Sequence, residues 1–270
     1  MPWDGLQNDS GETRMICPVC RFLNDQSQKC VKCQKVLDDL NKYGAQIGSQ
    51  NGEAGIIRHI LDTIGEKDQT LIEIGFDKEC NSVDLLSNYG WEGWLLDSDH
   101  ANIIHGKMRW AKANVIEAHV TRENIKKIFK EHKVPSKVDM LAIDVDGIDY
   151  YLWEALKTNA RLVVIEYNAS FGPKASCVVE YDPNFNRFDV YPSYHGASLA
   201  ALVKLAAKKK YALVGCEASG INAFFVKKNL LKGDVVEMTV PEAYYQHRNR
   251  RSWGFELVAM DDRGLKFVEV

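Results

Sequence analysis

The feature that most constrains the fold is an alternation of short apolar runs with amphipathic segments along residues 55–226. The runs that we interpret as strands are 70–75, 91–97, 113–120, 138–144, 161–167, 211–216 and 222–226. Helical patterns occur at 55–65, 81–90, 121–133, 150–158 and 197–210. Continuous apolar strands that alternate with helices predict a parallel sheet covered by helices on both faces.

The last two apolar runs depart from this alternation, because only residues 217–221 separate them. So short a connection joins antiparallel strands, whereas parallel strands need a long crossover. The sequence therefore predicts an α/β domain over residues 45–270, with a mostly parallel sheet that ends in one antiparallel hairpin.

Charge and hydropathy exclude some classes of protein. The formal net charge of −3 provides no general attraction to nucleic acids or anionic membranes. The chain has no run of about 18 apolar residues, so no membrane span is predicted. Its first residues contain no apolar signal core, and we expect a cytoplasmic protein. Residues 1–16 carry few apolar side chains, which predicts a flexible tail.

Four of the seven cysteines form two Cys-x-x-Cys pairs, Cys17–Cys20 and Cys30–Cys33, with nine residues between the pairs. Four thiolates in two such pairs can complete the closed tetrahedral shell that structural zinc prefers. We interpret residues 17–36 as a zinc-ribbon-like module with a structural or protein-binding role. Unrelated surface thiols, an iron centre and a redox pair are the alternatives.

The other three cysteines, Cys80, Cys177 and Cys216, have no such grouping. Isolated cysteines in a chain of this kind are usually small buried apolar residues, and we expect that role for them.

A candidate cofactor site begins at the strand that ends in Glu73-Ile74-Gly75. The glycine permits a tight turn that a cofactor can approach closely. Asp97 ends the next strand, about 20 residues later, where a carboxylate accepts the ribose hydroxyls of a nucleoside. The GxGxxG loop that the pyrophosphate of NAD requires is absent, whereas S-adenosylmethionine carries no phosphate. The pattern therefore favours S-adenosylmethionine as the cofactor.

Several blocks together resemble the FkbM-type methyltransferases over residues 48–228: SQNGEAGIIRHIL, LIEIG, NSVDLLSNYGWEGWLLDSD, VTRENI and LAIDVDGIDYYLWEAL. The resemblance implies a Rossmann-like class I methyltransferase fold and methyl transfer, usually to oxygen and often on sugars or natural products. It also implies that Glu73, Gly75, Asn81, Ser82 and Asp97 contact the cofactor. The chain departs from the family pattern in its first loop, where a single glycine precedes the bulky, charged segment 76–79.

Acidic and amide side chains follow two neighbouring strands. Asp144 ends one strand, and Glu166 and Asn168 follow the next. The carboxyl ends of parallel strands converge on the ligand crevice, so we expect these three side chains to lie together. They could hold Mg²⁺ against an acceptor hydroxyl, or one carboxylate could act as a general base. A purely structural alternative is that strand-end carboxylates cap helices, with Asp146 or Asp149 as an N-cap.

Three further segments have candidate roles. His195 precedes a helix and is a candidate catalytic base or a local structural donor. The long, aromatic-rich segment 168–195 is typical of a lid or a binding wall. The basic cluster at residues 247–251 can bind a phosphate or remain a solvated surface patch.

The leading function is O-methylation of a small-molecule or glycan acceptor by S-adenosylmethionine. One alternative is a protein or RNA methyltransferase that uses the zinc module for recognition, although the acidic charge balance disfavours RNA. Another is a cofactor-binding scaffold that has lost catalysis, which the irregular first loop allows.

Elemental analysis should find one tightly bound Zn²⁺ per chain, and Cys17→Ser or Cys33→Ser should release it. The variant should keep most of its secondary structure, because the predicted α/β domain has its own core. A metal-free protein with four titratable free thiols in this segment would contradict the zinc assignment.

Overall fold

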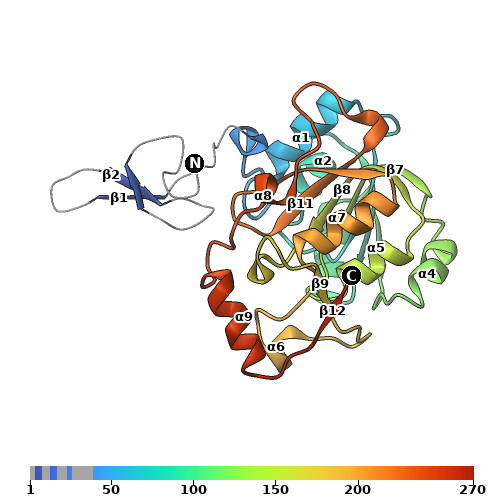
Figure 1. The fold of residues 1–270 in the computed structure, drawn as a ribbon. Helices are drawn as coiled ribbons and strands as arrows, with labels where there is room; N and C mark the ends of the chain where they lie inside the picture. The colour runs from blue at the N-terminus through green and yellow to red at the C-terminus, as the bar shows by residue number, and fades with distance from the viewer. Residues whose placement is uncertain (1–3, 8–12, 17–22, 26–38) are drawn as a thin grey trace.

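A seven-stranded sheet organises the part of the chain that the computed structural model describes, which is residues 4–7, 13–16, 23–25 and 39–270. Its strands lie in the order β6-β5-β4-β7-β8-β11-β10. They are β4 (Thr70–Ile74), β5 (Glu92–Asp97), β6 (Asn114–Glu117), β7 (Lys137–Ile143), β8 (Asn159–Glu166), β10 (Tyr211–Cys216) and β11 (Asn222–Lys227). Figure 1 shows the sheet at the centre of the molecule.

The strand directions agree with those predicted from the sequence. The pairs β4–β5, β5–β6, β4–β7 and β7–β8 are parallel, whereas β11 is antiparallel to both β8 and β10. Five parallel strands followed by one hairpin, with the last strand inserted next to β8, form the Rossmann-like arrangement of class I methyltransferases. The fold predicted for the α/β domain is confirmed.

Helices cover both faces of this sheet. On one face, α1 (Glu53–Ile64) buries Ile56, Ile57 and Ile60 against alternate strand residues such as Leu162. On the other, α5 (Asp149–Ala155) and α7 (Leu199–Lys208) bury residues that include Leu152 and Leu202. Burial on both faces explains why the central strands are mostly apolar.

The remaining helices near the sheet edges are α2 (Val83–Ser87), α3 (His100–Arg109) and α4 (Ile125–Glu131). Helix α3 is not among the helices predicted from the sequence. Only Ile103 and Gly106 of this helix are buried, so its apolar stripe is too narrow to recognise. The side chains of Cys80, Cys177 and Cys216 are buried, as expected.

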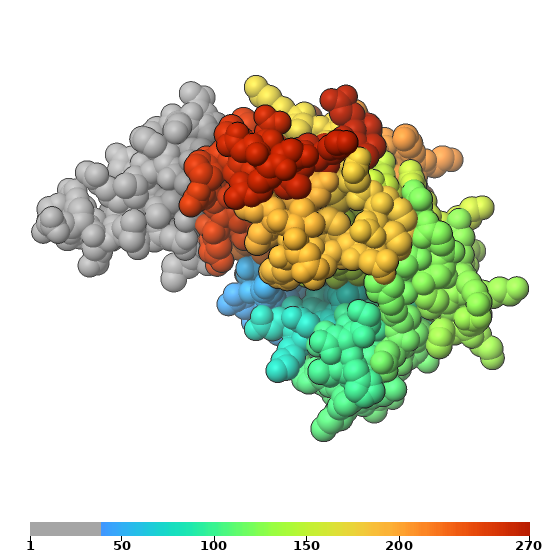
Figure 2. Space-filling view, turned by 90° about the horizontal axis from the view of Figure 1, so that it is seen from below, coloured from blue at the N-terminus to red at the C-terminus, as the bar shows by residue number. Residues whose placement is uncertain are grey.

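A second layer consists of parts of the segment that follows β8 and of the C-terminal residues. It contains η2 (Ala169–Phe171), β9 (Cys177–Val179), α6 (Arg187–Val190), α9 (Trp253–Asp261) and β12 (Phe267–Glu269). The two helices directly after β11, η3 (Lys228–Leu230) and α8 (Val240–Ala243), pack instead on the core around the main sheet. Strand β12 pairs antiparallel with β9, and Phe171, Val179 and Met260 belong to one small apolar cluster. Figure 2 shows these two parts of the chain side by side.

The N-terminal segment contains a small antiparallel sheet, β1 (Asp4–Gln7), β2 (Thr13–Ile16) and β3 (Leu23–Asp25). Strands β1 and β2 thus fall within residues 1–16, for which we expected a flexible tail. The four paired cysteines lie outside the described residues, and so does the rest of the predicted module apart from β3. The short helix η1 (Leu40–Tyr43) follows this segment and leads into the α/β domain. Among the described residues, no helix is long and apolar enough to cross a membrane.

After β4 the chain adds β5 and β6 on one side of that strand, and it then crosses over to add β7 on the other side. Gly75 follows β4 with a φ of +78°, and a Cβ added there would lie 1.7 Å from the carbonyl oxygen of Asp144, which follows β7. Only glycine tolerates both this backbone conformation and this contact. Gly75 therefore sets how closely the ends of the two central strands approach.

Gly75→Ala should destabilise the protein by at least about 1–3 kcal/mol, the cost of the backbone conformation alone, with more from the contact with Asp144. Urea unfolding measures this loss. Gly254→Ala in α9 is the matched control, since a Cβ there meets nothing within 4 Å. Equal unfolding midpoints for the two variants would contradict the role of Gly75.

Candidate active site

A cavity of about 800 Å³ lies at the carboxyl ends of the five parallel strands. Each of these strands contributes residues to its wall, for example Gly75 after β4, Asp97 at the end of β5, Ala118 after β6, Asp144 after β7 and Glu166 at the end of β8. The cavity thus occupies the crevice where open α/β sheets bind their ligands.

Glu73 organises the loop after β4. Its carboxylate is buried and accepts hydrogen bonds from the backbone N–H groups of Asn81 (2.8 Å) and Ser82 (3.0 Å). Burial raises the pKa of Glu73 to about 6, although these two bonds favour its charged form. Glu73, Gly75 and Asn81 line the cavity, whereas Ser82 does not. Of the five predicted cofactor residues, Glu73 and Ser82 thus hold the conformation of the loop between β4 and α2 by their hydrogen bond.

Asp97 connects the ends of β4 and β5. Its Oδ2 accepts from the backbone N–H of Phe76 at 3.1 Å, and its Oδ1 accepts from that of Asp99 at 2.6 Å. Burial raises the pKa of Asp97. A carboxylate has about four acceptor sites, so Asp97 keeps capacity for hydroxyl groups inside the cavity that it lines.

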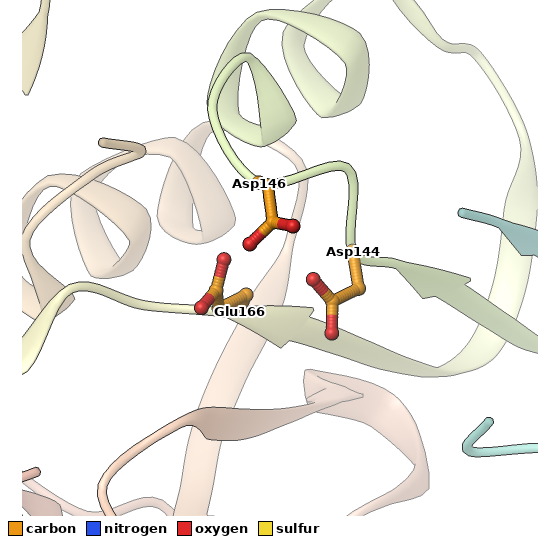
Figure 3. A group of neighbouring side chains, drawn as sticks. All are labelled: Asp144, Asp146 and Glu166. Atoms are coloured by element: carbon orange, nitrogen blue, oxygen red, sulfur yellow. The ribbon is translucent and has the colours of Figure 1, made fainter. Parts of the chain in front are cut away.

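Asp144, Asp146 and Glu166 form a carboxylate cluster, with one oxygen of each within 4.8 Å of the others. Figure 3 shows the three side chains pointing toward one another from the end of β7, the loop before α5 and the end of β8. Asp146 reaches this position because its φ is +58°, a conformation that aspartate tolerates better than most residues. Burial raises the pKa of Asp144 well above its usual range, and the charge of Glu166 raises it further.

The structure does not place Asn168 in this cluster. Its Oδ1 accepts from the Ser170 N–H at 2.9 Å and from Arg250 at 3.1 Å. Its Nδ2 donates to the carbonyls of Ser193 and His195, each at 2.8 Å. The amide of Asn168 thus fastens the long segment after β8. Asp146, expected only as a possible N-cap, faces Asp144 and Glu166 instead.

Neither Asp146 nor Asp149 is the N-cap of α5, because Ile148 holds that position and Asp149 is the first residue of the helix. The Asp149 carboxylate accepts from the backbone N–H groups of Val145 (2.8 Å) and Gly147 (3.0 Å). Burial raises its pKa to about 7, and the charge of Glu166 contributes. Asp149 therefore fixes the loop that carries Asp146.

Glu166 lies between two basic side chains. His195 Nδ1 is 3.4 Å from its Oε2, and Arg187 Nη1 is 4.0 Å from its Oε1. Burial disfavours the charged carboxylate, but His195, Arg250 and Arg187 outweigh it and lower the pKa to about 2. His195 is 1% exposed and does not line the cavity, so it contacts Glu166 from behind the wall.

The long segment and the basic cluster form the opposite wall. Pro183, Phe185 and Arg187 come from the segment predicted as a lid or wall, and Arg187 Nη1 lies 2.8 Å from Asp146 Oδ1. From the basic cluster, His247 and Arg250 line the cavity, whereas Arg248 and Arg251 are exposed. Burial, and then the charge of Arg250, lower the pKa of His247 to about 4, so it is neutral at physiological pH.

Sequence reasoning missed Asp146, Arg187 and Asn222 as parts of this wall. Asp146 lies in a loop and Arg187 begins the short helix α6, and the paths of both segments depend on tertiary contacts. Asn222 begins β11, and its neighbours could be identified only once the strand order was known.

Glu73 should make stability depend on pH. A carboxyl group with a higher pKa in the folded chain keeps its proton longer there, so stability falls as pH rises from about 4.5 to about 6. The loss should be about 2 kcal/mol at about 1.4 kcal/mol per pKa unit. Glu73→Gln cannot titrate and should lack it. Urea unfolding of both proteins across this range measures the difference, and parallel profiles would contradict the prediction.

Comparison with known proteins gives a likeness of fold. No protein-family model and no curated protein matches the chain. A TehB-like SAM-dependent methyltransferase from Corynebacterium glutamicum is 13% identical, with a TM-score of 0.38, over 64% of this chain and 87% of that chain. An O-methyltransferase from Bacillus cereus in complex with SAH is 14% identical, with a TM-score of 0.42, over 68% and 83%. A putative hemolysin from Streptococcus thermophilus is 12% identical, with a TM-score of 0.43, over 77% and 74%.

Proposed function

We propose that this protein is an S-adenosylmethionine-dependent methyltransferase that methylates a hydroxyl oxygen of a sugar, a glycan intermediate or a related small molecule. The observation that carries the proposal is one cavity with two chemically different sides. Asp97 lies on the β5 side of Gly75, and the carboxylate cluster lies on the β7 and β8 side. The likeness of the sequence to FkbM-type methyltransferases supports the same activity.

The residues on the first side fit the nucleoside part of the cofactor. The missing side chain of Gly75 leaves the backbone open to close approach. Asp97 offers unused acceptor capacity for ribose hydroxyls, and Asn102 lines the cavity beside it. When bound, the cofactor supplies an electrophilic methyl group on a sulfonium.

The residues on the second side fit the acceptor. A sugar hydroxyl is a weak nucleophile near neutral pH and needs a base or a metal ion to activate it. Asp144 can accept the hydroxyl proton at its carboxylate, directly or with a divalent cation held beside it. Burial and the charge of Glu166 raise the pKa of Asp144, which makes its carboxylate a stronger base. Glu166 lies beside Asp144, and His195 contacts Glu166 from behind the cavity wall.

The Cys17, Cys20, Cys30 and Cys33 module has a structural or protein-binding role in this proposal. Modification of a protein, with this module as the recognition arm, is the second candidate function. A cofactor-binding scaffold without catalysis is the third, and the turnover measurements below separate it from the first two.

Calorimetry should show binding of S-adenosylhomocysteine and none of NAD. Asp97→Ala should weaken the binding roughly ten- to a hundredfold, because a hydrogen bond to a charged group contributes about 1.5–3 kcal/mol. Asp68→Ala, at an exposed carboxylate outside the cavity wall, is the control. If wild-type protein binds no S-adenosylhomocysteine, the proposed function is wrong.

Asp144→Asn keeps the shape of the side chain and removes its charge. It should leave S-adenosylhomocysteine binding nearly intact and lower turnover by roughly a hundredfold or more, the usual scale for loss of a general base. The assay is transfer of a labelled methyl group to acceptors found by screening sugars and glycan intermediates. Normal turnover by Asp144→Asn on such an acceptor would show that Asp144 is not the activating group.

A further inference from the structure

Three oxygen-bearing side chains form a row across neighbouring strand ends. Ile143 of β7 pairs with Ile165 of β8, which places Asp144 level with Glu166. Glu166 pairs in turn with Asn222 of β11. Neighbouring strands lie about 4.7–4.9 Å apart, and directly opposed residues project to the same face. Asp144, Glu166 and Asn222 therefore stand side by side on one face of the sheet.

Asn222 presents an unused acceptor in this row. The residue is 4% exposed, and its Nδ2 donates to Glu53 Oε1 at 3.2 Å. Because a carboxylate only accepts, the amide nitrogen must face Glu53 and the Oδ1 must face away from it. That Oδ1 has no hydrogen-bond partner among the described residues, and Asn222 lines the cavity. An unmet buried acceptor destabilises a folded protein, so this oxygen points to a ligand.

The carboxylates beside Asn222 are crowded together. One oxygen each of Asp144, Asp146 and Glu166 lies within 4.8 Å of the others, so the three negative charges repel one another. Glu166 Oε2 is buried, and His195 Nδ1 lies 3.4 Å from it, too far for a well-formed hydrogen bond. A cation placed among the three carboxylates removes their repulsion, and the free Oδ1 of Asn222 can join them as a ligand.

We propose that Asp144, Asp146, Glu166 and Asn222 bind a hard divalent cation, Mg²⁺ or Mn²⁺. Three carboxylates and one amide oxygen form the oxygen-only ligand set that these ions prefer. With about six coordination positions, the ion keeps places for water and for an oxygen of the acceptor. The catalytic role of the ion rests on the proposed function, because there it lowers the pKa of an acceptor hydroxyl. Its binding does not rest on that function.

Arg187 provides a competing explanation and a way to test it. Its Nη1 lies 2.8 Å from Asp146 Oδ1, so the cluster could serve only to hold this guanidinium. That explanation does not account for the Oδ1 of Asn222, which would still lack a partner. If a cation binds, the charge of Arg187 opposes it, and Arg187→Gln should tighten the binding.

Mn²⁺ binding to the full chain, followed by electron paramagnetic resonance, tests the site. The zinc content is measured in parallel, since thiolates select zinc over manganese. Wild-type protein should bind one Mn²⁺ that Mg²⁺ displaces. Asp146→Asn should weaken Mn²⁺ binding roughly tenfold or more, because even loss of a group that only supports a ligand costs 10–100-fold. Asn222→Ala should weaken it too, and Arg187→Gln should strengthen it.

Asp146 is exposed, and asparagine accepts its backbone conformation, so Asp146→Asn should fold normally. Asp189→Asn, at a carboxylate on the same short helix as Arg187, is the matched control and should bind Mn²⁺ as wild type does. Absence of Mn²⁺ binding, or equal affinity in wild type, Asp146→Asn and Asn222→Ala, would overturn the proposal. S-adenosylhomocysteine binding, measured on the same samples, shows separately whether the proposed function stands.

Discussion

The contact between Gly75 and the carbonyl of Asp144 is the constraint on which the rest of the site depends. It brings the ends of β4 and β7 together at the point where the chain changes direction across the sheet. Glu73 and Asp97 lie on one side of this contact, and Asp144 and Glu166 lie on the other. A bulkier residue at position 75 would separate the two halves of the cavity. A contact between backbone atoms, and not between side chains, thus sets the distance between the nucleoside side and the acceptor side of the cavity.

Much of the fold could be predicted from the sequence, because the strands are buried on both faces and their apolar runs are continuous. The hairpin was predictable because the connection at 217–221 is too short for a crossover. Helix α3 was not predicted, because it buries few apolar side chains and so has no clear amphipathic pattern. The pairing of β9 with β12 joins segments far apart in the chain, and no local pattern encodes such a contact.

The candidate site was predictable only for residues at strand ends, because the order of the strands decides which of these residues lie next to one another. That rule placed Asp144 beside Glu166. It misplaced Asn168, because Arg250 and the backbone of the segment at 193–195 take up its amide. Asp146 depends on an unusual turn, and the free oxygen of Asn222 depends on which side of its amide Glu53 occupies. Both features depend on tertiary contacts, which residue types and their spacing do not reveal.

The cavity wall combines strand ends with residues 183–187 and 247–250, which are contributed late in the sequence. Chains are synthesised from the N-terminus, and early segments begin to fold first. A nascent chain that has reached only β8 already possesses Asp144, Asp146 and Glu166, but it lacks Arg187 and Arg250. The three acidic groups would then face one another without their basic counterparts. Assembly of this site during translation therefore passes through an electrostatically unbalanced stage, which ends when the later segments dock.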